Sequence, residues 1–273
     1  MSTTAPALAP DLVAALKRLK LSRVRALAPE VLQTAKTQRW SPEELLRTLV
    51  EAEIAARDQA NHTARLKIAG FPVSKLLDEF KVEQSSIPQA TFAYLAGLEW
   101  VRAVENCCLI GPAGTGKSHL LISLGHAAVA AGYRVRYFAA AELVETLYRG
   151  LADNSVGRVI DQVCKADLVL VDEVGFAPLD AVGTQLLFRF VAAAYERRSL
   201  GIASHWPFDQ WGRFLPEHTT AAALLDRLLH HAVIVVTAGE SFRMKEAHSR
   251  AGGSPRREEA GEWISPARTV TMA

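Results

Sequence analysis

The glycine-rich segment at residues 111–118 constrains the fold of this chain more than any other feature. Its sequence, Gly-Pro-Ala-Gly-Thr-Gly-Lys-Ser, matches the pattern G-x-x-x-x-G-K-[ST] at every fixed position. An apolar run at 107–110 precedes it, and a stretch rich in Leu and Ala at helical spacing, 119–131, follows it. A strand, a glycine loop and a helix together can cradle phosphate, because the glycines let backbone N–H groups turn inward and the helix N-terminus adds partial positive charge. A glycine-rich turn that binds nothing would not need these flanking elements, so the sequence predicts a nucleotide-binding protein.

The pattern also predicts individual roles within the loop. Lys117 is expected to reach the β- and γ-phosphates of ATP, and the Ser118 hydroxyl is expected to ligate Mg²⁺. The residues predicted to contact the nucleotide are the loop and the residue after it: Gly111, Pro112, Ala113, Gly114, Thr115, Gly116, Lys117, Ser118 and His119.

Two adjacent acidic residues end a later predicted strand. Residues 166–173 have the sequence Ala-Asp-Leu-Val-Leu-Val-Asp-Glu, so Asp172 and Glu173 stand at the carboxyl end of a strand, where open α/β sheets place ligands. Asp172 is predicted to hold Mg²⁺ through water, and Glu173 to orient and deprotonate the attacking water. An isolated Asp-Glu pair can also be a solvated strand end, but the accompanying phosphate loop favours hydrolysis over nucleotide binding alone.

Three further residues have both a functional and a structural interpretation. His205 ends the next predicted strand and could position the attacking water, although a lone His is more often a satisfied structural residue. Arg227 lies in an apolar helix, where it either pairs with an acid such as Asp226 or Glu217 or reaches the γ-phosphate of a neighbouring subunit. Arg243 could contact the γ-phosphate of its own site.

Composition and hydropathy limit the class of protein. The chain has 273 residues, 49% of them hydrophobic, and a mean hydropathy of +0.09, which suits one core of ordinary size with a small appended domain. No apolar run approaches the ~18 residues of a membrane span, and the N-terminus lacks the basic start and apolar middle of a signal peptide. Two of the three cysteines are adjacent in a predicted buried strand, which supports neither a disulfide framework nor a zinc site. These features predict a cytoplasmic protein without a membrane partner.

The first quarter of the chain is basic and is predicted to be helical. Residues 1–68 carry eleven Lys or Arg and seven Asp or Glu. Helices are predicted to begin after a capping Asp11, at Pro29, and at a capping box that starts with Ser41. Five basic residues with no acid between them indicate either a solvated helix face or a contact with a phosphate backbone: Lys17, Arg18, Lys20, Arg23 and Arg25.

Strands and helices alternate through the rest of the chain, which predicts an α/β fold with a mostly parallel sheet. Strands are predicted at 107–110, 133–139, 166–173, 200–204 and 233–237, and helices at 89–101, 119–131, 141–149 and 186–196. The predicted organisation is a helical N-terminal domain over 1–62, a linker over 63–88, an ATPase domain over 89–250 and a disordered tail over 251–273.

Several segments resemble the IstB family, the AAA+ ATPase helpers of insertion-sequence transposition and relatives of the DnaC helicase loaders. The likeness runs from about residue 12 to residue 250, and its most specific motifs are DRLLHH and GESFR. By this resemblance, Arg227 matches a trans-acting arginine finger and Arg243 a sensor-2 arginine. His205 stands where the family has a sensor-1 Asn, a departure that bears on the hydrolysis rate more than on nucleotide binding. The segments that carry the likeness are 65–80, 111–120, 171–179, 195–212, 224–232 and 239–245.

The resemblance implies a P-loop AAA+ core that binds ATP and Mg²⁺ and carries no C-terminal lid domain. It also implies an oligomer that binds duplex DNA without strong sequence preference and delivers that DNA to a transposase, with ATP hydrolysis as a timer. If Arg227 acts in trans, hydrolysis requires assembly.

Other functions use the same motifs. A replicative helicase loader is the nearest alternative, since it would pair the same ATPase core with a different client. A DNA-binding scaffold with little turnover would follow if His205 impairs hydrolysis. A small-molecule kinase with a phosphate loop would leave Arg227 and Arg243 without a role.

Overall fold

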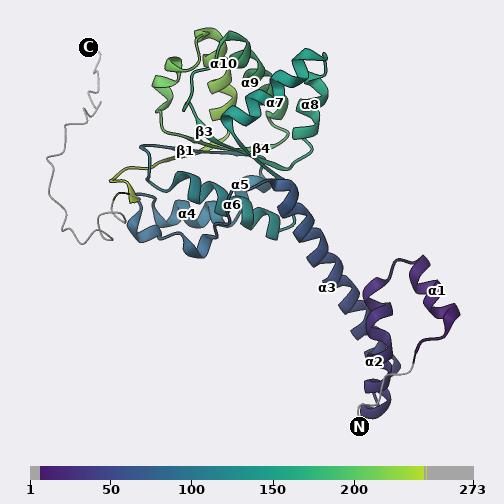
Figure 1. Ribbon diagram of the computed structural model, residues 1–273. Helices are drawn as coiled ribbons and strands as arrows, with labels where there is room; N and C mark the ends of the chain where they lie inside the picture. Colours follow the sequence, from purple (N-terminus) through teal and green to yellow (C-terminus); the bar gives the residue numbers. More distant parts are fainter. Residues whose placement is uncertain (1–6, 243, 245–273) are drawn as a thin grey trace, which may run out of the picture.

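The computed structural model describes residues 7–242 and residue 244. A helical projection leads into an α/β core, as Figure 1 shows. The strands are β1 (Asn106–Ile110), β2 (Val135–Ala139), β3 (Leu168–Val174), β4 (Ser199–Ser204) and β5 (Ala232–Val236). The α-helices are α1 (Pro10–Arg18), α2 (Ser22–Gln38), α3 (Pro42–Ala69), α4 (Gln89–Ala96), α5 (Glu99–Arg102), α6 (Lys117–Ala130), α7 (Ala140–Ala152), α8 (Val156–Val163), α9 (Ala181–Ala194) and α10 (His218–Leu229), and short 3₁₀ helices lie at Leu77–Glu79, Val82–Gln84 and Phe208–Arg213.

The core is a parallel five-stranded sheet with the strand order β2-β3-β4-β1-β5. Helices α7 to α10 cover one face and α4 to α6 cover the other (Figure 1). Strands β1, β3 and β4 are apolar and buried almost throughout, as expected for parallel strands with helices on both faces. The predicted α/β fold is therefore confirmed, and each predicted strand is present to within two residues.

The helix predicted at 89–101 is divided in two, so that prediction was wrong. Helix α4 ends at Ala96, and α5 begins at Glu99 after Leu98, which has a positive φ of 58°. The break turns Trp100 into the core, where it is fully buried and its Nε1 donates to the Leu95 carbonyl at 3.1 Å. Burial of this indole offsets the local cost of the left-handed residue.

The N-terminal helices form the projection, and α3 connects it to the core (Figure 1). The predicted capping box is confirmed: the Ser41 hydroxyl accepts from the Glu44 N–H, and the Glu44 carboxylate accepts from the Ser41 N–H. Helix α3 ends at Ala69, and its C-cap residue Gly70 adopts the left-handed conformation with φ 75°. Because α3 continues to Ala69, it passes through the predicted boundary between residues 62 and 63, and the division into domains stays a prediction.

Two predicted helix starts in this region were wrong. Pro10 begins α1 with Ala9 at the N-cap, so Asp11 lies in the first turn rather than at the cap. Pro29 lies inside α2, although an interior proline removes a helix hydrogen bond. Packing against α3 stabilises α2 across the proline and buries Val24, Ala28 and Ala35.

A carboxylate from α3 holds the start of α2. Glu53 is buried, and its Oε2 accepts from the backbone N–H groups of Arg23 at 2.8 Å and Val24 at 3.1 Å. Its Oε1 accepts from Nε of Arg57 at 3.0 Å. Burial alone would raise the pKa of Glu53, but the hydrogen bonds from Val24, Arg57 and Arg23 outweigh it and lower the pKa below its usual value.

We expect Glu53→Gln to lower the melting temperature of the chain at neutral pH, because a neutral amide accepts these hydrogen bonds more weakly than a carboxylate. A lowered pKa means that the stabilisation by Glu53 is present above the ordinary Glu range near ~4.3 and is lost as the pH falls through the folded-state value. The difference between wild type and variant, measured by circular dichroism, should therefore shrink in acid. Glu51→Gln, an exposed neighbour, is the control and should change little. A difference that persists unchanged in acid would contradict this role.

Within residues 7–242 and 244, the structure contains no helix with the length and apolar character needed to cross a membrane.

Candidate nucleotide-binding site

The carboxyl ends of four strands meet at one edge of the sheet. Ile110, the last residue of β1, pairs with Ser204 of β4 and with Val236 of β5, and Ser204 also pairs with Val174 of β3. The residues that follow these strands therefore lie side by side. They include the phosphate loop, His205 and the segment that begins with Thr237.

Two positions in the phosphate loop have a backbone conformation and a close contact that only glycine can accommodate. Gly111 has φ 147°, and a Cβ there would lie 2.1 Å from the Thr237 carbonyl oxygen. Gly114 has φ 81°, and a Cβ there would lie 2.0 Å from Oγ of Ser241. The loop is thus packed tightly against the chain that follows β5.

Lys117 directs its charge into this loop. It is the first residue of α6, is 9% exposed, and donates from Nζ to the carbonyls of Gly111 at 2.7 Å and Pro112 at 2.6 Å. Gly116, with φ 91°, is the N-cap, so the N-terminus of α6 opens at the loop. An ammonium group and a helix N-terminus at a glycine cradle are suited to a polyphosphate, so the residues present fit ATP.

The other predicted loop residues surround this centre. Pro112 and Ala113 are exposed at the loop tip, and Ser118 is half-buried at the start of α6. The Thr115 hydroxyl donates to the Pro112 carbonyl at 2.9 Å and lies 2.7 Å from the Thr237 hydroxyl.

His119 faces the connection between α3 and α4 rather than the loop centre. Its ring meets the edge of Phe80 at 5.5 Å between centroids, and Phe80 also contacts Gly116. Burial, followed by the charge of Lys75, lowers the pKa of His119. Its predicted contact with the nucleotide stays a prediction.

Asp172 is buried and held from two sides. Its Oδ1 accepts from the backbone N–H of Glu173 at 2.8 Å, and its Oδ2 accepts from the Tyr137 hydroxyl at 3.0 Å. Burial and the charge of Asp172 raise the pKa of Tyr137, so this phenol remains a donor. The Asp172 carboxylate and the Ser118 hydroxyl are oxygen donors of the kind that Mg²⁺ prefers, so these residues fit the ion.

Glu173 has a strained backbone at the end of β3. It is exposed and has φ 58°, a conformation that is uncommon for residues other than glycine. The pairing of β3 with β4 shifts register between Val171 and Val174, which places Asp172 and Glu173 in an irregular segment of the strand. Such irregularities change the direction in which side chains point. Here they leave Asp172 buried and Glu173 exposed to solvent.

His205 lies between the acids and the loop, as the strand order requires. It is half-buried, and its ring lies 4.8 Å from that of Trp206. Burial, followed by the charge of Lys117, lowers the pKa of His205. The neutral imidazole is therefore favoured near pH 7, with one nitrogen that donates and one that accepts.

We expect His205→Ala to lower ATP turnover by about 10–100-fold with little change in ATP affinity, because a lost water-positioning group affects the chemical step. His205→Asn should keep most of the turnover, since an amide can also donate a hydrogen bond. Steady-state kinetics with a fluorescent-nucleotide titration separates the two effects. Equal activity of wild type and the Ala variant would assign His205 a structural role.

Arg227 lies away from the phosphate loop of its own chain. It donates from Nη1 to the Ala223 carbonyl at 3.0 Å, and its guanidinium lies 5.0 Å from the centre of the Phe188 ring on α9. Helix α10 ends two residues after it, just before the amino end of β5, whereas the loop follows the carboxyl end of the adjacent β1. The structure thus groups Lys117, His205 and the two acids at one edge but leaves Arg227 on the α9–α10 surface. Arg243, the predicted sensor-2 residue, lies outside the described residues.

The sequence analysis missed Tyr137, Thr237 and Ser241. Thr237 could have been found by the rule that identified His205, since it is a polar residue directly after a strand. Tyr137 lies on the strand paired with β3, but its contact with Asp172 depends on the register Ala139 to Asp172, which the sequence does not specify.

A family model described as IstB-like ATP binding protein matches residues 14–250. The chain belongs to this family. A protein from Pseudomonas aeruginosa, described as the insertion sequence IS21 putative ATP-binding protein, is 35% identical over 237 residues, covering 86% of this chain and 89% of that protein. The insertion sequence IS5376 putative ATP-binding protein of Geobacillus stearothermophilus is 33% identical, covering 78% and 85% of the two chains.

Among solved structures, the IstB-like chain is similar to the replication initiator DnaA bound to AMPPCP and single-stranded DNA. The TM-score is 0.50 and the identity is 20%, over 67% of this chain and 56% of that chain. This likeness concerns the fold alone.

Proposed function

We propose that this IstB-like protein is an ATP-dependent helper of transposition that assembles on duplex DNA and delivers it to a transposase. The family match over residues 14–250 carries the proposal, because it includes both the helical projection and the P-loop core. The similar proteins of Pseudomonas aeruginosa and Geobacillus stearothermophilus are both described as insertion-sequence ATP-binding proteins. We propose that the protein acts on DNA in the cytoplasm.

We further propose that the protein hydrolyses ATP and that hydrolysis times the release of DNA. Lys117 would hold the β- and γ-phosphates, and Ser118 and Asp172 would supply oxygen ligands for Mg²⁺. Glu173 would accept a proton from the attacking water, and His205 would orient that water. The different surroundings of the two acids support this division, since Asp172 is fixed by Tyr137 whereas Glu173 is exposed.

Self-association is part of the proposal. Arg227 and the phosphate loop lie at opposite ends of neighbouring elements, which supports a role for Arg227 at the γ-phosphate of an adjacent subunit. Arg243 is proposed to contact the γ-phosphate of its own site, by its position in the GESFR motif.

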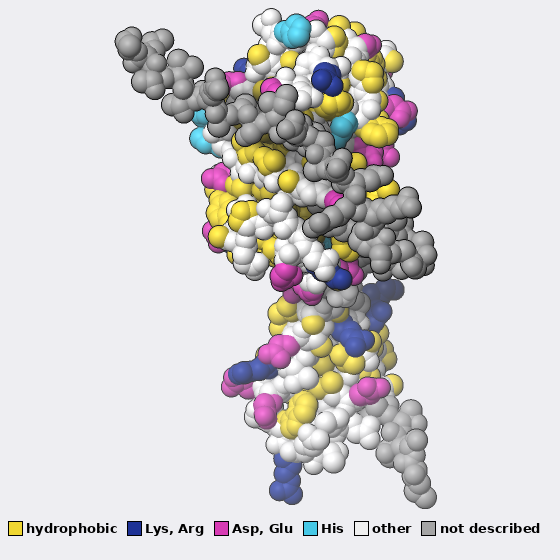
Figure 2. Space-filling view, turned by 90° about the vertical axis from the view of Figure 1, so that its left-hand side faces the viewer, with side chains coloured by type: hydrophobic (Ala, Val, Ile, Leu, Met, Phe, Trp, Pro, Cys, Tyr) yellow, Lys and Arg dark blue, Asp and Glu magenta, His cyan; other side chains and the backbone are white. Residues whose placement is uncertain are grey.

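The helical projection is proposed to contact DNA or the transposase. The basic residues Lys17 and Arg18 end α1, Lys20 lies in the turn, and Arg23 and Arg25 begin α2, so one exposed corner carries all five. Figure 2 shows hydrophobic side chains exposed among charged ones on the projection. Helix α3 exposes Leu46 at 63%, Val50 at 45% and Ile54 at 53%, which supports contact with another molecule.

Replacing Lys17, Arg18 and Lys20 together by Ala should weaken the salt dependence of duplex-DNA binding. The slope of log affinity against log salt should fall in magnitude by about 2–3, because each lost phosphate contact reduces it by ~0.9. Fluorescence anisotropy at several salt concentrations measures this slope. A Lys36→Ala, Arg39→Ala double variant at the other end of α2 is the control. An unchanged slope in the triple variant would move the DNA contact to the ATPase core.

The function as a whole is tested by an integration assay with an IS21-type transposase, donor DNA and target DNA. Integration into the target should require this protein and ATP. Integration that is equally efficient without the protein, with the transposase known to be active, would contradict the proposed delivery of DNA.

A further inference from the structure

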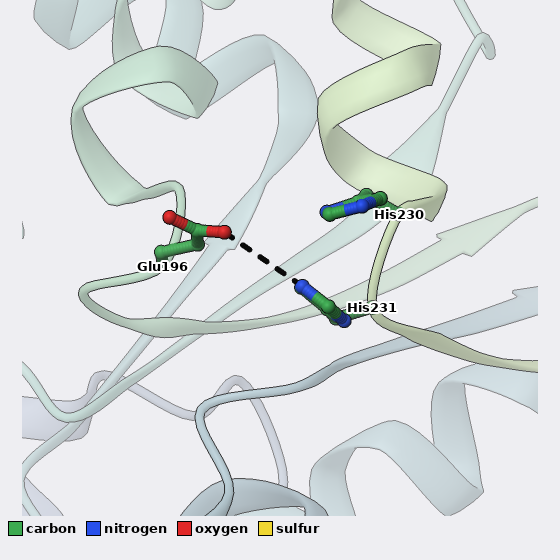
Figure 3. Close-up of side chains that lie close together, drawn as sticks. All are labelled: Glu196, His230 and His231. Carbon is green, nitrogen blue, oxygen red and sulfur yellow. Dashed lines mark ion pairs between the residues drawn. The ribbon is translucent and has the colours of Figure 1, made fainter.

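Two histidines and a glutamate come together at the edge of the sheet opposite the nucleotide site. Glu196 lies in the turn between α9 and β4, and His230 and His231 lie in the turn between α10 and β5. Figure 3 shows the two imidazole rings one above the other, with the Glu196 side chain facing them. Strands rise ~3.3 Å per residue, so the length of β4 separates this cluster from the phosphate loop by roughly 15–20 Å.

The donor atoms of this cluster are close enough for one metal ion. One ligand atom from each residue lies within 4.8 Å of the others, and His231 Nε2 is 3.7 Å from Glu196 Oε1. In a tetrahedral zinc site with bonds of ~2.0–2.1 Å, ligand atoms lie roughly 3.3 Å apart. Because all three side chains are exposed, small side-chain rotations can close the difference without a backbone change.

The backbone holds the three residues in place although their side chains are exposed. The His231 carbonyl accepts from the N–H of Asn106 at 2.7 Å, which fixes it beside β1. The His230 N–H donates to the Asp226 carbonyl at 3.1 Å. Glu196 has φ 54°, in the left-handed region. Its turn therefore gives the side chain a direction that a residue with negative φ would not have.

A tyrosine occupies the position of an outer-shell partner. The hydroxyl of Tyr195 lies 2.8 Å from Nδ1 of His230, which leaves Nε2 of that ring for a metal ion. Metal-binding histidines usually have their second nitrogen held in this way, which fixes the ring orientation.

The surrounding charges and space are compatible with a cation. The guanidinium of Arg198 is directed elsewhere, since its Nε donates to the Cys164 carbonyl at 2.7 Å. An open pocket of about 580 Å³ adjoins the cluster and is lined by both histidines and by Glu105. The pocket leaves room for water in a fourth coordination position.

We propose that Glu196, His230 and His231 form a binding site for a divalent transition-metal ion of the zinc class. Two imidazoles and one carboxylate are the donors that Zn²⁺ accepts, with water completing a tetrahedron. The ion joins the α9–β4 turn to the α10–β5 turn and thereby clamps the end of α10. Arg227 lies in the last turn of α10, just before His230, so the ion also restrains the region that carries Arg227.

The test is a Zn²⁺ titration of the nucleotide-free full chain, after treatment with a chelator, in competition with a chromophoric zinc indicator. Wild type should bind one Zn²⁺ per chain at this site. Glu196→Gln and His231→Gln should each weaken this binding by more than the ~10–100-fold that loss of an outer-shell partner costs. Tyr195→Phe should weaken it by ~10-fold. His218→Gln, an exposed histidine on α10, is the matched control and should not change it.

A second measurement distinguishes a built site from loose histidine binding. Saturating Zn²⁺ should raise the melting temperature of wild type and of His218→Gln, because a ligand that binds only the folded state stabilises it, but not that of Glu196→Gln or His231→Gln. Equal zinc affinity in wild type and both ligand variants, or no zinc binding by wild type, would overturn the proposal. Neither result depends on ATP or DNA.

Discussion

Replacing Glu173 by Gln is expected to lower ATP turnover by on the order of 10²–10⁴-fold, because the amide cannot accept the proton of the attacking water. ATP affinity should be retained, since the phosphate loop and Asp172 are untouched. Phosphate release and a fluorescent-nucleotide titration measure the two quantities. Glu145→Gln, an exposed glutamate on α7, is the control and should leave turnover unchanged.

This substitution also separates hydrolysis from a purely DNA-binding role. If wild-type turnover on duplex DNA is already negligible before the substitution, the protein is a nucleotide-dependent scaffold. If wild type turns over and the variant does so equally well, the proton acceptor is another residue and the assignment of Glu173 is wrong.

Arg227→Ala is expected to reduce turnover by on the order of 10³-fold or more, the range in which arginine fingers operate. The variant should still bind ATP, because Arg227 contacts Ala223 and Phe188 rather than its own phosphate loop. Arg189→Ala, which removes an exposed arginine from α9, is the matched control and should leave turnover within about twofold, as surface substitutions usually do.

Mixing two inactive variants tests whether Arg227 acts in trans. An Arg227→Ala chain keeps its own Glu173, and a Glu173→Gln chain keeps its own Arg227. In a mixed assembly, some sites regain both groups, so the mixture should recover part of the wild-type turnover on DNA. A mixture that stays as inactive as each variant alone, although mass measurement shows mixed assemblies, would contradict catalysis in trans.

The phosphate loop and the strand ends could be predicted from the sequence because they depend on neighbours in the chain. The positive φ angles of Gly111, Gly114 and Gly116 follow from the local motif. Asp172 and His205 could be placed at one edge because parallel strands bring their carboxyl ends together.

The features that escaped prediction depend on residues far apart in the sequence. The start of α2 needs the carboxylate of Glu53, which is 29 residues from Val24, so Pro29 looked like a better helix start. The side-chain hydrogen bond that fixes Asp172 comes from Tyr137, which is 35 residues away in the sequence. The break at Leu98 follows from the burial of Trp100 against the sheet, which no local propensity reveals. In each case tertiary contacts outweigh the local preference.

We propose above all that this IstB-like protein is an ATPase that becomes active when it assembles on duplex DNA. ATP turnover with and without plain duplex DNA, beside the mass of the protein under the same conditions, tests it most directly. We expect DNA with ATP to raise both the mass and the turnover, and the free chain to be nearly inactive. Free-chain turnover equal to the DNA-bound turnover, with no change in mass, would contradict it.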